Sequence, residues 1–159
     1  MAWFIADNLG GGVRDVRCMV LGGHGDSMVP MPQFSTVDGV SIPNLIPTDE
    51  IDALNHRTQH GGAEIVNLLK TGSAYYAPSA AAVAMAKSIL RDEHRLLPCA
   101  AYLDGQYGLS GLYMGVPCVL GKNGVERIVE LEIEDGGMAK LNASAEAIRA
   151  DIETLRSEL

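Results

Sequence analysis

The sequence lacks a phosphate-binding loop. No Gly-x-Gly-x-x-Gly follows an apolar strand pattern, and no Gly-x4-Gly-Lys-Ser/Thr occurs in the chain. Loops of these two kinds present bare backbone N–H groups to the phosphates of a nucleotide. The chain by itself is therefore expected to offer no recognisable cradle for a nucleotide phosphate.

Positive charge and long apolar runs are also scarce. Twelve Lys and Arg against twenty Asp and Glu give a net charge of −8. This argues against nucleic acid or an anionic membrane as a partner, because both require a basic face. Residues 1–9 contain no apolar stretch long enough for a signal peptide or a membrane span. The charge balance therefore argues against both kinds of partner, and the composition is that of a soluble globular protein.

Cysteine is rare, and its three positions are far apart in the sequence. Cys18, Cys99 and Cys118 are odd in number and lack the short paired spacings of a zinc site. This pattern fits a reduced chain in the cytoplasm better than a disulfide framework. We therefore expect three small buried hydrophobic side chains, a cytoplasmic location and no metal site.

What is present is the composition of one globular domain, expected to span residues 1–159. Hydrophobic residues make up 47% of the chain and charged residues 20%, as in ordinary globular proteins. A domain of this size buries about 70% of its extended-chain surface. No internal repeat, low-complexity tract or linker divides the chain.

Periodicity and glycine positions predict four helices, over residues 2–9, 48–69, 78–90 and 137–159. The first should stop at the triple glycine Gly10-Gly11-Gly12, because glycine terminates helices. The last should bury a single apolar stripe, since its apolar residues recur at steps of four and three. That stripe consists of Leu141, Ala145, Ile148, Ile152, Leu155 and Leu159.

Strands are expected over Val16–Leu21, over a short extended piece at Met31–Thr36, and over residues 96–103, 113–120 and 125–133. Asn123-Gly124 between the last two apolar runs is a strong hairpin signal. The returning strand alternates, with Val125, Arg127, Val129, Leu131 and Ile133 on its mostly apolar face. Helices and antiparallel strands are segregated along the chain, so the expected fold class is α+β.

One histidine stands out by its neighbours. His24 follows an apolar run and lies among Gly22, Gly23 and Gly25. Glycines at this density make sense where a ligand approaches the backbone closely or where φ must be positive. A histidine titrates near neutral pH and can move one proton per turnover. We therefore predict that His24 is a catalytic general acid/base.

The other polar candidates favour structural roles. Asp26 and Ser27 lie too close to His24 in sequence to form a hydrolytic triad with it. His56 and His60 have the i, i+4 spacing of helical metal ligands but no third ligand, so a solvated helix face is expected. His94 is expected in a surface turn.

Several segments together resemble a known family. The matching segments are Gly22-Gly23-His24-Gly25-Asp26-Ser27-Met28-Val29-Pro30, Gly61-Gly62-Ala63-Glu64-Ile65-Val66, Leu69-Lys70-Thr71-Gly72-Ser73-Ala74-Tyr75-Tyr76-Ala77-Pro78, Gly105-Gln106-Tyr107-Gly108, Gly115-Val116-Pro117 and Gly124-Val125-Glu126-Arg127-Ile128. They run in family order over nearly the whole chain. The chain resembles the C-terminal catalytic domain of the lactate/malate dehydrogenase family, in its lactate-dehydrogenase-like bacterial malate dehydrogenase branch.

The resemblance implies half of an active site. It covers only the antiparallel, helix-packed C-terminal domain of the family. The Rossmann half, the mobile specificity loop and the Asp-x-x-Arg pair that orients the histidine and holds the substrate carboxylate would lie outside this chain. His24 carries over as the catalytic residue. Ser73 and Ala74 would bind substrate, and Pro78 would lie on the nicotinamide side of the pocket.

The implied function is that of an NAD-dependent malate dehydrogenase of the tricarboxylic acid cycle, which interconverts malate and oxaloacetate. NAD would be bound mainly by the N-terminal Rossmann domain, and the chain alone would be inactive. A homo-oligomer is expected, because the face bearing Met28, Val29, Ala74 and Pro78 would leave an apolar patch open. Two alternatives remain: a non-catalytic folding or assembly unit, or a domain of a lactate (or other 2-hydroxy acid) dehydrogenase.

Overall fold

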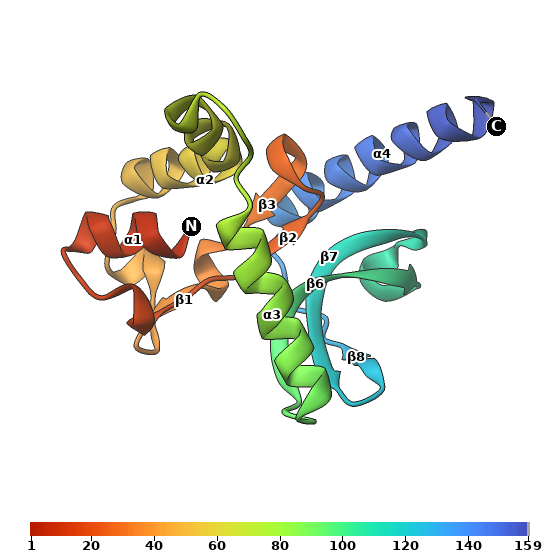
Figure 1. The fold of residues 1–159 in the computed structure, drawn as a ribbon, viewed down its shortest axis with the longest axis horizontal. Coiled ribbons are helices and arrows are strands. Elements are labelled where there is room, and N and C mark those ends of the chain that lie inside the picture. Colours follow the sequence, from red (N-terminus) through yellow and green to blue (C-terminus); the bar gives the residue numbers. More distant parts are fainter. Residues whose placement is uncertain (159) are drawn as a thin grey trace.

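A computed structural model describes residues 1–158 and contains four α-helices in that range (Figure 1). The helices are α1 (Ala2–Leu9), α2 (Thr48–Leu69), α3 (Tyr76–Leu90) and α4 (Asp135–Glu158). The strands are β1 (Val16–Arg17), β2 (Val20–Gly22), β3 (Met28–Pro30), β4 (Thr36–Val37), β5 (Val40–Ser41), β6 (Arg95–Asp104), β7 (Ser110–Gly121) and β8 (Gly124–Ile128). All four expected helices are confirmed within two residues at their start, and α1 ends at Gly10 in the left-handed conformation.

The strands form two antiparallel sheets. The larger has the order β3-β2-β7-β6, with β8 also paired to β7, and the smaller has the order β1-β4-β5. Every strand pair within residues 1–158 is antiparallel. The α+β class is therefore confirmed, and the described residues contain no parallel β-α-β unit of a Rossmann half.

The predicted continuous strand Val16–Leu21 is wrong, because the chain changes sheets within it. β1 belongs to the smaller sheet and β2 to the larger. Between them the Met19 N–H donates to Ser35 Oγ at 3.0 Å instead of to a neighbouring strand. The predicted extended piece Met31–Thr36 is also wrong, because Pro32–Phe34 forms a 3-10 turn.

The predicted β7–β8 hairpin is confirmed, with Gly121 opposite Gly124. Its returning strand is shorter than expected and ends at Ile128. Beyond that point the Tyr107 hydroxyl donates to Val129 O at 2.9 Å and accepts the Leu131 N–H at 3.0 Å. The Val129 N–H still donates to Pro117 O of β7 at 2.8 Å, but the Tyr107 hydroxyl occupies the Val129 carbonyl and the Leu131 amide, and the strand ladder stops.

The main core lies between the larger sheet and α4. The β7 side chains Leu112, Met114, Val116, Cys118 and Leu120 are almost fully buried, and so are Leu141 and Ala145 of α4. The predicted α4 stripe packs on the core only as far as Ile152. Leu155 is 62% exposed, and Leu159 lies outside the described residues. Figure 1 shows the outer end of α4 projecting away from the rest of the chain.

Cysteine burial agrees with the prediction at two of three positions. Cys99 and Cys118 are buried, whereas Cys18 is only half-buried, and all three are free thiols. A hydrogen bond with Cys99 and burial raise the pKa of Cys118, so this thiol stays neutral and packs as a small hydrophobe. No helix within residues 1–158 is long and apolar enough to cross a bilayer.

Candidate active site

His24 lies in the loop that joins β2 to β3, just before a short 3-10 turn over Gly25–Ser27. Its own backbone is extended, with φ −108° and ψ 149°. Two glycines beside it require their lack of a side chain, since φ is 86° at Gly22 and 70° at Gly25. The loop therefore reverses direction sharply around the histidine, and the imidazole is left exposed.

Two helices hold this loop. From α4, Ser144 Oγ accepts the Gly23 N–H at 2.9 Å. From α2, Gln59 Nε2 donates to Met28 O at 3.0 Å. The His24 ring itself has no hydrogen bond or ion pair within residues 1–158. The backbone around the imidazole is thus fixed while its two nitrogens remain available.

The His24 imidazole borders a hollow of about 430 Å³, which we call the His24 hollow. Apart from the imidazole, its lining within the described residues carries no charged group and consists of Val20, Leu21, Gly22, Gly23, Met28, Pro98, Cys99, Ala100, Tyr113, Met114, Gly115 and Ile148. Glycine is required at one of these positions, because a Cβ on Gly115 would stand 2.7 Å from Gly22 O. The lack of a side chain at Gly115 lets β7 approach β2 at Gly22, next to the His24 loop.

A larger hollow of about 630 Å³ lies on the other side of the same loop, between α2 and α4. Its lining includes Asp26, Asp52, His56 and Lys140 but not His24. The Asn55 Oδ1 atom, which is buried, has no hydrogen-bond partner among the described residues. The predicted catalytic residue therefore borders the smaller of the two hollows and not the larger one.

The predicted substrate and cofactor residues lie elsewhere on the chain. Ser73 and Ala74 belong to the connection between α2 and α3, and Pro78 is in the first turn of α3. None of the three lines either hollow beside the His24 loop. Their roles stay predictions. The predicted open patch is partly wrong, because Val29 is only 5% exposed.

Sequence reasoning missed the residues that anchor the loop. Ser144 is buried, with 3% exposure, in a helix face otherwise lined by Leu141 and Ala145. A serine inside an apolar helical stripe was the only signal available, since buried hydroxyls need partners. His56 and His60 are exposed, as predicted for a solvated helix face. Their contacts were not predicted: His60 Nε2 lies 3.5 Å from Asp26 Oδ1, and the two rings stack.

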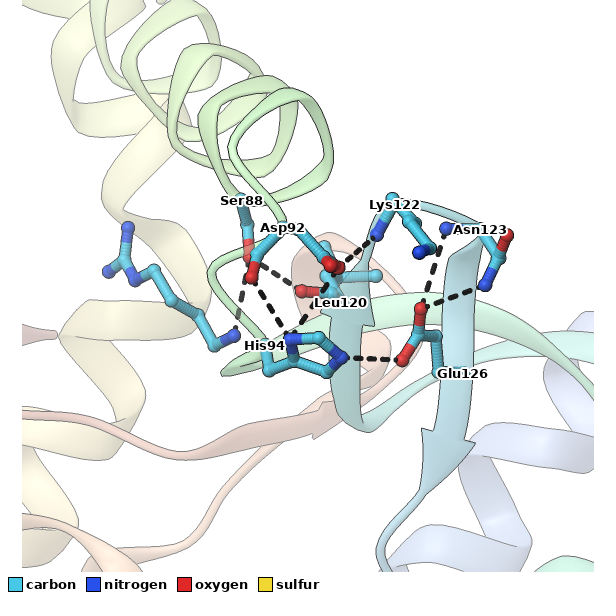
Figure 2. Close-up of polar contacts among 8 residues, drawn as sticks. Ser88, Asp92, His94, Leu120, Lys122, Asn123 and Glu126 are labelled. Atoms are coloured by element: carbon cyan, nitrogen blue, oxygen red, sulfur yellow. Dashed lines mark hydrogen bonds and ion pairs between the residues drawn. The ribbon is translucent and has the colours of Figure 1, made fainter.

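His94 lies in a cluster of polar contacts between the α3–β6 turn and the β7–β8 hairpin (Figure 2). Its Nε2 lies 2.9 Å from Glu126 Oε2, and its Nδ1 lies 3.0 Å from Asp92 O and 3.5 Å from Asp92 Oδ1. The hydrogen bond to the Asp92 carbonyl, then the Asp92 and Glu126 charges, raise the pKa of His94. Its exposed position is as predicted, while the cluster was not foreseen.

The geometry of this cluster indicates ion pairing. Ligand atoms of Asp92, His94 and Glu126 all lie within 4.8 Å of one another, a spacing that could hold a metal ion. The two carboxylates, however, face different nitrogens of one ring. A doubly protonated imidazole satisfies both acceptors at once, so the three groups join the α3–β6 turn to the β7–β8 hairpin.

Comparison with known proteins identifies the family and the relatives that this chain resembles. Residues 1–159 match the family described as lactate/malate dehydrogenase, alpha/beta C-terminal domain. The chain is 56% identical over 153 residues to the malate dehydrogenase of Roseiflexus castenholzii, covering 96% of this chain and 50% of that protein. The chain thus spans about half the length of the curated relatives it matches.

Solved structures agree with this match. The malate dehydrogenase from Salinibacter ruber superposes with a TM-score of 0.93 at 46% identity, over 99% of this chain and 52% of that one. A lactate dehydrogenase from Cryptosporidium parvum, solved with lactic acid and nicotinamide adenine dinucleotide, gives a TM-score of 0.92 at 39% identity, over 98% of this chain and 50% of that one.

Proposed function

Since this chain belongs to the lactate/malate dehydrogenase family as its α/β C-terminal domain, we propose that it is the substrate-side half of an NAD-dependent malate dehydrogenase. In this proposal His24 is the general acid/base that exchanges the hydroxyl proton of malate. The observation that carries it is an exposed imidazole whose two nitrogens have no partner within residues 1–158, on a loop whose backbone is held by two helices. General acid–base catalysis needs such a group in a fixed position.

In this proposal the residues of this chain contact NAD only at its nicotinamide end. The His24 hollow is lined mainly by apolar side chains and glycines beside the imidazole, and a flat ring or a small acid could lie there. The described residues hold no strand-to-helix glycine loop for a pyrophosphate. The dinucleotide is therefore assigned mainly to the half of the full-length relatives that lies outside this match.

The proposed mechanism follows from the His24 ring. NAD, when bound, supplies the hydride exchange at C2 of the substrate. As malate is oxidised, a neutral His24 nitrogen takes the hydroxyl proton. In the reverse direction the protonated ring donates that proton to the oxaloacetate carbonyl oxygen and polarises the carbonyl beforehand. The lining from β6 and β7 offers mainly apolar side chains beside the exposed ring, and water would leave the ring when substrate and cofactor cover it.

The chain alone is proposed to be inactive. Malate and oxaloacetate are dicarboxylates, and the His24 hollow contains no Arg or Lys among its described lining residues. The net charge of −8 also disfavours anionic ligands. NADH fluorescence titration of the chain, followed by addition of oxaloacetate, tests this. Saturable micromolar binding or turnover would contradict it.

The substrate itself is tested in an enzyme with both halves. We would join the chain to the N-terminal half of the Roseiflexus castenholzii relative and follow NADH oxidation with oxaloacetate and with pyruvate. The proposal predicts a higher kcat/KM for oxaloacetate. A preference for pyruvate would favour the alternative of a lactate dehydrogenase domain.

A second candidate role is assembly, and one observation favours it. Apolar side chains are exposed along the end of α2 and on α3, including Leu68 at 75%, Tyr76 at 82% and Leu90 at 85%. Exposed apolar surface of this kind promotes association. Sedimentation of the chain should show dimers or larger species, and a strictly monomeric chain at high concentration would count against a homo-oligomer.

The proposed location of the protein is the cytoplasm, because its cysteines are free thiols.

A further inference from the structure

A single buried hydroxyl fastens both sides of the His24 loop. Ser144 Oγ accepts the Gly23 N–H at 2.9 Å and donates to Ser27 O at 2.6 Å. Gly23 immediately precedes His24, and Ser27 follows it by three positions. The serine is 3% exposed, so water cannot readily replace either bond. Within the loop, the Ser27 hydroxyl donates to His24 O at 3.2 Å and adds a third tie.

The glycines of the loop are matched to this serine. A Cβ on Gly22 would stand 2.8 Å from Ser144 Oγ, and a Cβ on Gly23 would collide with the Ser27 hydroxyl. The hydroxyl therefore reaches the loop backbone because the facing residues have no side chains. The glycines and Ser144 form one arrangement contributed by the two ends of the chain.

Two other buried serines show what such a bridge does elsewhere. Ser88 Oγ donates to Leu120 O at 2.7 Å and accepts the Arg95 N–H at 3.3 Å. Ser35 Oγ donates to Met31 O at 2.9 Å and accepts the Met19 N–H at 3.0 Å. Both tie separate backbone segments together, and neither spans a group proposed to react. Among the three buried serines of residues 1–158, Ser144 alone binds backbone on both sides of an exposed imidazole.

We propose that Ser144 is a positioning residue for His24: its hydroxyl fixes the backbone on both sides of the imidazole and so holds the ring in place for proton transfer. The inference rests on the proposed function of His24. A bridge of this kind restricts the ring without touching it and leaves both ring nitrogens available. Catalysis depends steeply on such placement.

The first test uses the 159-residue chain and needs no turnover. Ser144→Ala removes the acceptor for the Gly23 amide, so hydrogen exchange at that amide should speed up by about tenfold or more. The ring proton NMR signals of His24 should shift or broaden, because the loop samples more conformations. Ser144→Cys, with similar shape and a weaker hydrogen bond, should change both readouts in the same direction by less.

The matched control is Ser88→Ala, which also loses two backbone bonds at a fully buried serine. It should lower stability comparably while leaving the His24 ring signals and Gly23 exchange unchanged. If Ser144→Ala and Ser88→Ala affect His24 equally, or neither affects it, Ser144 is a structural serine and the inference is overturned.

The second test uses the enzyme joined to the N-terminal half of the relative. Ser144→Ala should lower kcat by about tenfold with a smaller change in KM, because substrate contacts are intact while the ring is misplaced. Unchanged kcat would overturn the inference. If His24→Asn leaves turnover intact, the proposed function fails instead, whatever the NMR result for Ser144.

Discussion

The turns that carry His24 and His94 hold their histidines in opposite ways. At His94, both ring nitrogens face oxygen acceptors from Asp92 and Glu126, and the ring joins two segments by charge. At His24, the ring has no partner within residues 1–158, and the surrounding backbone is tied instead. The His94 ring therefore joins parts of the fold, whereas the proposed catalytic role of His24 requires ring nitrogens that no protein group occupies.

The hydrogen bonds around the two turns support this contrast. The Asp92 carboxylate also accepts the Lys122 N–H at 2.9 Å, and Glu126 accepts the Asn123 side-chain amide at 3.2 Å (Figure 2). That cluster is built from exposed charged side chains, whose pairs are sensitive to salt and pH. The His24 loop is held by a buried hydroxyl, which salt does not screen.

The strongest way to break the contrast is to change each histidine to asparagine in the two-half enzyme. His24→Asn should lower kcat by roughly 10²–10⁴, the usual contribution of general acid–base catalysis. His94→Asn is the matched control and should retain near-normal kcat. Steady-state kinetics with oxaloacetate check both. Equal losses in the two variants would mean that the two histidines do not divide their roles as proposed.

A second change tests the close approach of β7 to β2 at Gly22, next to the His24 loop. Gly115→Ala places a Cβ at 2.7 Å from the Gly22 carbonyl oxygen, and backbone cannot move aside cheaply. We expect a loss of about 1–3 kcal/mol in the free energy of unfolding, measured by urea denaturation. Gly136→Ala, in the first turn of α4 with open space around it, should be neutral or stabilising. The opposite ranking would contradict the role of this contact.

The charged character of the His94 turn predicts a pH dependence. Because the folded-state pKa of His94 is raised, its stabilisation is full below the unfolded value of about 6.5. That stabilisation is lost as the pH rises through the folded value. The Tm difference between the wild type and His94→Asn should therefore shrink between pH 6 and pH 9. Asparagine tolerates the positive φ of 50° at this position, so the comparison isolates the ring.

The control for this prediction is Glu126→Gln, which removes one of the two carboxylates facing the ring. It should weaken the pH dependence without abolishing it, because Asp92 remains. A Tm difference that is independent of pH would show that His94 is not charged in the folded state.

The smallest expected effect is that of removing the charge of Asp26, which tests whether ion pairing helps to hold the His24 loop. Asp26 is 88% exposed at its side chain and lies 3.5 Å from His60 Nε2. Exposed pairs of this kind contribute little, about 0–1 kcal/mol. Asp26→Asn should leave Tm nearly unchanged and should not alter Gly23 amide exchange. A clear change in that exchange would mean that charge also holds this loop.

What could be predicted from the sequence had local causes. The end of α1 at Gly10 and the hairpin at Asn123-Gly124 depend on neighbouring residues, and both are confirmed. The break between β1 and β2 was missed because it depends on Ser35, 16 positions from Met19. The early end of β8 was missed because the Tyr107 hydroxyl, 22 positions before Val129, takes over its hydrogen bonds.

In the candidate site too, features with local causes could be predicted and features that depend on distant residues could not. His24 could be chosen because its glycines are adjacent in sequence. Ser144 and Gln59 could not, because they lie 121 and 31 positions from the backbone groups they bind. Spacing and composition carry no record of such pairs, so the sequence predicted a reactive side chain but not the residues that hold its loop.

The pairing of β2 with β7 bears on the order in which the chain folds. Gly22 opposite Gly115 is the one register pair between these strands in the described residues, and Ser144 closes the loop from 121 positions away. Contacts between residues so far apart in sequence form slowly, because closing the long intervening loop costs conformational entropy. At about 5–20 residues per second on a ribosome, the segment around His24 waits roughly ten seconds for α4. The helices and the β7–β8 hairpin can form from neighbouring residues as they emerge, whereas the surroundings of the imidazole are completed last.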